Sequence, residues 1–280
     1  MSADILTITN HDRNIFQGKY IYPVVSRRAD GLSIGVNLNT NNACNWQCIY
    51  CEVPNLKRGK PEPIDLTLLK EELIYWLNQV INKDFLDKHT EPGTLLRDIA
   101  FSGNGEPTAA KEFGAAVKIV MEQIHSFQLE SKVTIRLITN GSYLDHSSTQ
   151  KAWSQLENLN REIWFKIDAI DSIESKRINQ INISKKSVLS NLKSSIKISP
   201  TIIQTCVLKI NNELPSMQAI NHYIEFLKPF ENSLKAIHLY SLARPTEQQT
   251  SNFIERLSYD ELQSVAENIK QLNIPVLSFI

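Results

Sequence analysis

The chain has 280 residues, of which 42% are hydrophobic and 21% are charged, and its 30 basic side chains equal its 30 acidic ones in number. The length suffices to bury the core of one large α/β domain. Zero net charge excludes a chain drawn to nucleic acid or to an acidic membrane by its overall field. The first residues lack a signal peptide, and no apolar run reaches the roughly 18 residues that span a bilayer, so we expect a cytoplasmic protein without membrane contact.

Short β-rich runs alternate with longer helical patterns along the chain. The expected strands cover residues 33–38, 97–103, 133–139, 162–169, 201–209 and 235–242, with a last run at 275–280. The expected helices cover residues 66–81, 111–127, 149–159, 185–196, 216–227 and 259–272. We expect Thr108 to cap the second helix, and Ser258 to form a capping box with Glu261 for the last one.

Six β/α alternations predict a parallel sheet covered by helices. Because six units fall short of a closed eight-unit barrel, a partial barrel and an open doubly wound sheet both fit the pattern. We expect one domain over residues 1–280, with an N-terminal arm at 1–30 that covers the base or edge of the sheet. The core would cover residues 30–245, and a C-terminal helix and strand would cover 246–280.

Polar and glycine-rich segments follow the ends of the expected strands. They are the cysteine loop at 41–55, "SGNGEPT" at 102–108, "TNGS" at 139–142, Asp168, Lys209 and "SLARPT" at 241–246. The carboxyl ends of parallel strands meet at one edge, where ligands bind. The sequence therefore predicts a site at this rim. His238 is expected to be a core histidine, and the polar run at 243–258 to be a lid or a packing arm.

Three of the four cysteines, Cys44, Cys48 and Cys51, lie within eight residues after the first expected strand. Three thiolates on one loop can each bind one iron of a cubane [4Fe–4S] cluster and leave the fourth iron free for a ligand. Soft thiolates also suit zinc, but a structural zinc site wants four ligands, and Cys206 is expected to be a packed thiol within a strand. A zinc site and unmetallated thiols remain the alternatives.

The pattern Cys44-x3-Cys48-x2-Cys51, with Tyr50 before the last cysteine, resembles the signature of the radical S-adenosylmethionine (SAM) superfamily over about residues 30–245. The resemblance implies a partial (β/α)6 barrel of the radical SAM type, similar to a TIM barrel. It also implies a [4Fe–4S] cluster on the three cysteines, SAM on the open iron, and a reductant protein of the flavodoxin or ferredoxin type. Reductive cleavage of SAM would give a 5′-deoxyadenosyl radical that abstracts hydrogen from a substrate.

Other segments match the same resemblance. Residues 101–108 resemble the family's Gly-Gly-Glu motif, in which Gly103 and Gly105 would let the backbone approach a ligand and Glu106 would meet the amino group of SAM. Residues 139–141 resemble a turn beside SAM, although Asn-Gly alone is a common turn. The implied SAM contacts are Tyr50, Gly103, Asn104, Gly105, Glu106, Pro107, Thr139, Asn140, Gly141, Lys166 and Asp168.

Three residues are implied as catalytic. Lys166 and Asp168 share one face of the fourth strand, where buried charges need a partner or a ligand, and a structural ion pair is the alternative. Arg244 follows the sixth strand and could bind an anionic substrate group with two hydrogen bonds.

The run at 22–51 is similar to one branch, the tRNA wyosine-base synthases, in the order of Pro23, Ser26, Arg27, Arg28, Ser33, Gly35, Asn45 and Tyr50. That branch carries a second cluster, which the single remaining Cys206 could not hold. We therefore expect a related enzyme with another substrate. RNA, reached through Lys57, Arg58 and Lys60, is one option, although these residues also fit a solvated loop. A small-molecule or protein substrate, as for a glycyl-radical activase, is the second option, and a non-enzymatic metal-binding protein is the third.

Overall fold

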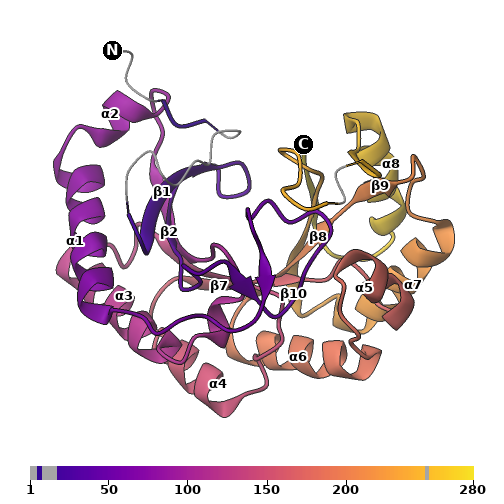
Figure 1. Ribbon diagram of the computed structural model, residues 1–280, viewed down its shortest axis with the longest axis horizontal. Coiled ribbons are helices and arrows are strands. Elements are labelled where there is room, and N and C mark those ends of the chain that lie inside the picture. The colour runs from indigo at the N-terminus through magenta and orange to yellow at the C-terminus, as the bar shows by residue number, and fades with distance from the viewer. Residues whose placement is uncertain (1–4, 8–17, 250–251) are drawn as a thin grey trace.

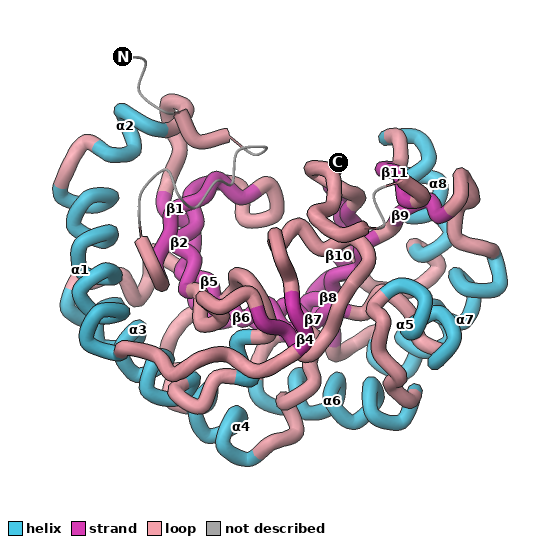
Figure 2. The backbone as a smooth tube through the Cα atoms, viewed as in Figure 1, coloured by secondary structure: helices cyan, strands magenta, loops and turns pink. Residues whose placement is uncertain are grey.

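An eight-stranded sheet curls into a half-barrel with its helices on the outside (Figures 1 and 2). The structure is a computed structural model that describes residues 5–7, 18–249 and 252–280. The strand order follows the chain: β1 Ile21–Ser26, β2 Gly31–Val36, β5 Leu96–Phe101, β6 Thr134–Thr139, β7 Arg161–Lys166, β8 Thr201–Cys206, β10 Leu234–Tyr240 and β12 Val276–Phe279.

All the strands from β2 to β12 in this sheet run parallel, while β1 pairs antiparallel with β2. The sequential order has no switch point, so the partial barrel is confirmed and the open doubly wound sheet is wrong. The strand β1 was not predicted, because Pro23 argues against a central strand. It stands at the edge of the described sheet, where proline is tolerated. The expected arm at 1–30 stays a prediction, and residues 1–4 and 8–17 of it lie outside the described residues.

Each expected helix is present with ends shifted by a few residues. The longer helices are α1 Leu66–Asn82, α3 Phe113–Ser126, α4 Ser147–Ser154, α6 Lys185–Ile198, α7 Met217–Leu227 and α8 Tyr259–Ile269. Two short helices, α2 Phe85–His89 and α5 Ser172–Ile178, were not predicted, and neither were the 3-10 turns Pro107–Ala109 and Lys228–Phe230. Among the described helices, none combines the length and the apolar character needed to cross a bilayer.

One expected helix cap is confirmed and another is wrong. Ser258 and Glu261 form the capping box of α8, each side chain accepting from the backbone of the other. Thr108 does not cap α3, which begins five residues later, after Glu112. Instead Thr108 lies in the 3-10 turn, and its hydroxyl donates to Glu106. The shift has a physical reason, since a buried carboxylate without a positive partner attracts the hydrogen-bond donors nearest to it.

Short strand pairs outside the main sheet place two loops. The strand β3 Ala43–Cys44 pairs with β4 Lys57–Arg58, and β9 Leu208–Ile210 pairs with β11 Ile254–Arg256. The expected strand at 201–209 is therefore broken after Cys206. Lys209 consequently points to α8 and pairs with Glu261 at 2.8 Å, away from the rim where we expected it.

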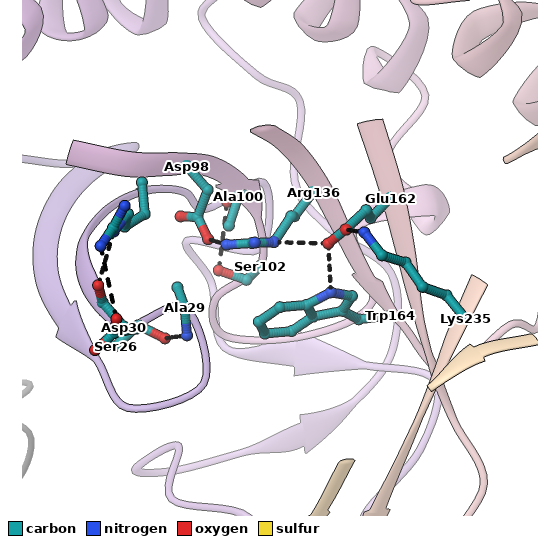
Figure 3. A network of polar contacts seen from close by, with 11 residues as sticks. Ser26, Ala29, Asp30, Asp98, Ala100, Ser102, Arg136, Glu162, Trp164 and Lys235 are labelled. Atoms are coloured by element: carbon teal, nitrogen blue, oxygen red, sulfur yellow. Dashed lines mark hydrogen bonds and ion pairs between the residues drawn. The ribbon is translucent and has the colours of Figure 1, made fainter. Parts of the chain in front are cut away.

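A layer of charged residues crosses the inside of the half-barrel near the amino ends of the strands (Figure 3). Arg136 on β6 donates to Asp98 on β5, and its Nε lies 3.1 Å from Oε2 of Glu162 on β7. Glu162 also accepts from Lys235 on β10 and, at 3.2 Å, from the indole of Trp164. The sequence did not predict this layer, which ties four strands together through opposite charges.

His238 on β10 is a core residue, as predicted, with 4% of its surface exposed and its ring against Trp164 and Phe279. Burial, with Arg28 and Arg136 nearby, lowers its pKa to about 4. Below about pH 6.5 this histidine is protonated in the unfolded chain but stays neutral in the folded one. The free energy of unfolding should therefore fall by about 3 kcal/mol as the pH drops from about 6.5 to about 4. Denaturant titrations at several pH values between 4 and 6.5 would measure the free energy of unfolding, which should depend less on pH in His238→Gln than in wild type. If it depends on pH as steeply in the variant, His238 is not the group responsible.

Candidate functional site

The carboxyl ends of the parallel strands open into one cavity of about 970 Å³. Most of the predicted site residues lie on its wall: Cys44, Cys48, Tyr50, Cys51, Gly103, Asn104, Gly105, Glu106, Thr139, Asn140, Lys166 and Arg244. Pro107, Gly141 and Asp168 lie behind this wall, and Asp168 lines a small adjoining pocket. The fold thus gathers segments that are separated by up to 200 residues in the sequence.

The cysteine loop is fixed from two sides. Toward β6, the Nδ2 of Asn140 donates to Oδ1 of Asn45 at 2.9 Å, and the indole of Trp46 donates to Ser142 at 3.1 Å. Toward α5, the backbone N–H of Ile49 donates to the carbonyl of Ile178 at 2.9 Å. Hydrogen bonds to two neighbouring parts of the barrel therefore hold the loop that carries the thiols.

Two of the three thiols accept hydrogen bonds at sulfur. The backbone N–H of Trp46 lies 3.4 Å from Sγ of Cys44, and Nδ2 of Asn179 lies 3.3 Å from Sγ of Cys48. Burial raises the pKa of Cys44 to about 12 and that of Cys51 to about 11, and it raises that of Cys48 as well. Buried thiols of this kind stay protonated until a metal replaces the proton.

Within the described ranges, no three His, Cys, Asp or Glu side chains stand together as ligands of one metal ion. A cubane cluster makes a different demand, because each thiolate binds its own iron at a separate corner. Three thiols on one cavity wall, two of them with an N–H group directed at sulfur, fit that demand. Such N–H groups are among the features that set the potential of iron–sulfur clusters.

Glu106 is a buried anchor between two loops. Its side chain is 2% exposed and accepts from the hydroxyl of Thr139 and the backbone N–H of Asn140, both at 2.7 Å, besides Thr108. Burial raises its pKa, and these donors oppose that shift. The carboxylate that we expected to meet an ammonium group thus already holds the end of β6. Its contact with a cofactor stays a prediction.

Glycine at position 105 serves an approach between protein loops. A Cβ there would lie 2.3 Å from the carbonyl of Ala43 and 2.6 Å from the side chain of Asn39. The 103–106 turn consequently packs directly on the cysteine loop. Asn37 holds it in place, since its Oδ1 accepts from the backbone of Asn104 at 3.1 Å. Gly105 also lines the cavity, and its predicted contact with a ligand stays a prediction.

Asp168 accepts hydrogen bonds from several residues behind the cysteine loop. Its side chain is fully buried and accepts from the Tyr50 hydroxyl, from Nδ2 of Asn179 at 2.7 Å and from the backbone of Cys206 at 2.9 Å. Through Asn179 it also orients a donor toward Cys48. The Asp168 carboxylate therefore positions the loop from below, a role that its place at the end of a strand does not reveal.

Replacing Asp168 with asparagine should lower the free energy of unfolding by about 3 kcal/mol. The change removes a buried charge beside Lys166 and turns an amide N–H toward groups that are themselves donors. Urea unfolding at pH 7 would measure the loss. Asp145→Asn, which makes the same change on a half-exposed side chain, serves as the control. Equal losses in both variants would contradict the positioning role of Asp168.

Lys166 reaches into the cavity over the ring of Tyr50, with Nζ 4.5 Å from the ring centre and 4.0 Å from Oδ2 of Asp168. Burial lowers the pKa of Lys166, whereas interactions with Tyr240, Asp168 and the nearby thiols raise it, and the net direction is upward. The Asp168 carboxylate is the nearest group that favours the charged form of Lys166. The structural ion pair that we considered is present in loose form.

Arg244 donates to Glu52, next to Cys51, and its Nε is buried without a partner among the described residues. The following segment packs on the cysteine loop. Thr246 donates to the carbonyl of Cys51 at 2.9 Å, and the Nε2 of Gln248 donates to the same carbonyl at 3.1 Å. The polar run at 243–258 was expected to be a lid or a packing arm. Its described part up to residue 249 packs on the cysteine loop, as a packing arm would. Residues 250–251 lie outside the described ranges.

The basic residues past the cysteine loop are exposed, as a solvated loop would be. Lys57 and Arg58 form β4, and Arg58 donates to the carbonyl of Gln180. They are not on the cavity wall, and neither is Lys60. The sequence did not single out Asn37, Asn179 or Thr246, although Thr246 ends the predicted rim segment at 241–246. Asparagines crowded directly after a strand, as at 37–42, are a signal for Asn37, while no local signal marks Asn179.

No family model matches the chain. It is similar to a UPF0026 protein of Helicobacter pylori (strain ATCC 700392 / 26695), with 28% identity over 245 residues that cover 86% of this chain and 70% of the relative. The name of that relative states no activity.

Solved structures with a similar fold include a radical SAM methyltransferase from Sphaerobacter thermophilus, with a TM-score of 0.62 and 12% identity over 92% of this chain and 68% of that one. Streptococcus suis SuiB bound to S-adenosylmethionine gives a TM-score of 0.59 and 12% identity over 91% of this chain and 52% of that one. The chain thus spans about half the length of SuiB. The fold is the partial barrel found in radical SAM enzymes.

Proposed function

We propose that the chain is a radical SAM enzyme, with a [4Fe–4S] cluster on Cys44, Cys48 and Cys51 and SAM in the adjoining cavity. The bound cluster and SAM would supply an electron transfer and a carbon radical that takes hydrogen from a substrate. One observation carries the proposal. Three thiols at radical SAM spacing line the same cavity as the 103–106 turn, Asn140 and Lys166, at the carboxyl rim of a radical SAM barrel.

The residues around the thiols have separable roles in this proposal. Asp168 and Asn179 position the loop, and Glu106 holds the ends of the surrounding strands together. Lys166 places a positive charge between Tyr50 and the cavity, where the carboxylate of SAM or a substrate anion is a suitable partner. Because these charges are fixed by the fold, the cavity is preorganised before any ligand enters.

The decisive experiment detects the product of SAM cleavage. The chain is purified without oxygen, its cluster is rebuilt with iron and sulfide, and 5′-deoxyadenosine is measured by mass after SAM and dithionite are added. We expect iron and sulfide in the protein and dithionite-dependent product. Stoichiometric zinc and no product would instead support the non-enzymatic metal-binding protein.

The position of the basic residues bears on the class of substrate. RNA modification, the reaction of the wyosine branch, would use Lys57, Arg58 and Lys60. Glu52 and Glu62 flank these three cations in the sequence, and the cations do not line the cavity, so a polyanion finds no basic surface there that continues into the cavity. We therefore favour a small substrate that enters the cavity. A flavodoxin or ferredoxin type protein is the proposed source of electrons.

A further inference from the structure

A second part of the cavity wall carries hydrogen-bond donors that the proposed cofactor contacts do not use. Arg27 and Arg28 lie in the turn between β1 and β2, and Gln204 lies on β8; all three line the cavity. The Nη1 of Arg28 donates to Oε1 of Gln204 at 2.8 Å. The turn thus reaches from one end of the half-barrel to a strand near the other.

The turn is held in place from inside the barrel. The guanidinium of Arg28 lies over the rings of Tyr240 and Trp164, with its carbon 4.6 Å and 5.6 Å from their centres. Next to it, Ala29 is buried in a small apolar cluster with Trp164 and Ile202. Stacking on both rings and the hydrogen bond to Gln204 therefore position the Arg28 guanidinium.

Gln204 has an unused donor. Its surface is 1% exposed, and its Nε2 has no hydrogen-bond partner in the described part of the chain, while its Oε1 is taken by Arg28. A buried N–H group without an acceptor is unfavourable, and such groups are rare in folded proteins. The acceptor that this donor lacks can come from a ligand in the cavity.

Positive charge is in excess at this part of the wall. Arg27 is half-buried, and no carboxylate in the described ranges lies within hydrogen-bonding distance of it. Burial, followed by the positive charges of Arg28 and Arg256, lowers its pKa from the ordinary value. Four acids of the wall are already engaged: Glu52 by Arg244, Glu62 by Thr40, Asp98 by Arg136, and Glu106 by Thr139 and Asn140. The fifth, Glu247, is exposed and contacts Cys51 through its backbone only.

We propose that Arg27, Arg28 and Gln204 form a substrate subsite that binds a carboxylate or phosphate group of a small molecule. All of the free groups at the subsite are donors, and two guanidinium groups match the oxygen geometry of both anions. A cavity of about 970 Å³ is within the range of small-molecule sites. The assignment rests on the function proposed above, because it names the substrate class of the same cavity.

The test measures anion binding to the anaerobically rebuilt protein. Inorganic phosphate and acetate are titrated in turn against chloride at constant ionic strength, and the midpoint of thermal unfolding is followed. Wild type should be stabilised in a saturable way, and the anion with the lower dissociation constant identifies the group. Arg27→Gln should weaken binding about ten-fold or more. Arg97→Gln is the matched control, since Arg97 pairs with Asp30 on the outer side of the same turn.

A second variant separates loss of the site from loss of the fold. Gln204→Glu places a carboxylate beside the two guanidinium groups. The free variant should unfold at the same temperature as wild type or a higher one, yet anion binding should be lost. Wild type without a saturable shift, or a shift that Gln204→Glu retains, would overturn the subsite.

Two further outcomes would reassign the arginines. If Arg27→Gln weakens SAM binding in equilibrium dialysis as much as it weakens phosphate binding, the subsite belongs to the SAM carboxylate. If a single-stranded RNA oligonucleotide binds through Arg27, a polymer replaces the small molecule. Each result overturns the proposal. If wild type forms 5′-deoxyadenosine but phosphate does not shift its unfolding midpoint, the subsite is wrong and the proposed enzymatic function stands. If phosphate shifts the midpoint but no product forms, the enzymatic function is wrong and the anion site stands.

Discussion

Replacing Cys48 with alanine should abolish 5′-deoxyadenosine formation and prevent the protein from retaining iron and sulfide. Two thiolates remain on the loop, and a cubane cluster held at two corners is lost more readily than one held at three. Cys48 is also the thiol toward which Asn179 directs its N–H group. Iron analysis and product detection by mass, both under anaerobic conditions, measure the two effects.

The matched control is Cys206→Ala. Cys206 is equally a buried free thiol of the same cavity, but it belongs to β8 and to no cysteine motif. This variant should retain its iron and form product. If both variants lose iron to the same extent, the loop has no special role, and the radical SAM proposal would have to be abandoned.

Replacing Arg136 with methionine should lower the free energy of unfolding by about 3–5 kcal/mol, the range for removing one partner of a buried ion pair. The side chains of Asp98 and Glu162 are 2% and 9% exposed, so neither carboxylate can turn to water when the guanidinium is gone. Burial already raises the pKa of Asp98 against the opposing effect of Arg136. Urea unfolding at pH 7 would measure the change.

Two comparisons make this prediction specific. Arg97→Met removes an exposed partner of Asp30 and should cost about 1 kcal/mol or less. Adding Asp98→Asn to Arg136→Met should restore part of the lost stability, because the uncompensated charge disappears. A double variant that is less stable than the single one would show that the loss comes from packing and not from charge.

The rim of the barrel could be predicted from the sequence because strand order and chain order coincide. Segments that follow successive parallel strands must then meet at one edge, which is where Cys44, Asn140 and Lys166 lie. The residues that orient them could not be predicted. Asn179 and Thr246 come from other parts of the chain, and their contacts depend on how α5 and the segment after β10 fold back on the loop.

The charged layer escaped prediction for a different reason. Asp98, Arg136 and Glu162 read as ordinary polar positions of strands with one solvated face, and only the curvature of the sheet turns them inward. In the same way, Pro23 concealed β1, and with it the turn that carries Arg28 into the cavity. Local patterns report which side chains alternate along a strand, but they do not report which face becomes the inside of a barrel.

The contact between the cysteine loop and the segment that follows β10 bears on how the protein matures. Thr246 and Gln248 bind the Cys51 carbonyl across 195 and 197 residues of chain. Closing a loop of that length has a large entropic cost that local contacts cannot offset early in folding. During synthesis the thiols leave the ribosome long before Thr246 and Gln248 do, so a nascent chain carries the cysteine loop without these contacts. For the cluster that we propose, insertion is therefore expected to follow release of the nearly complete polypeptide.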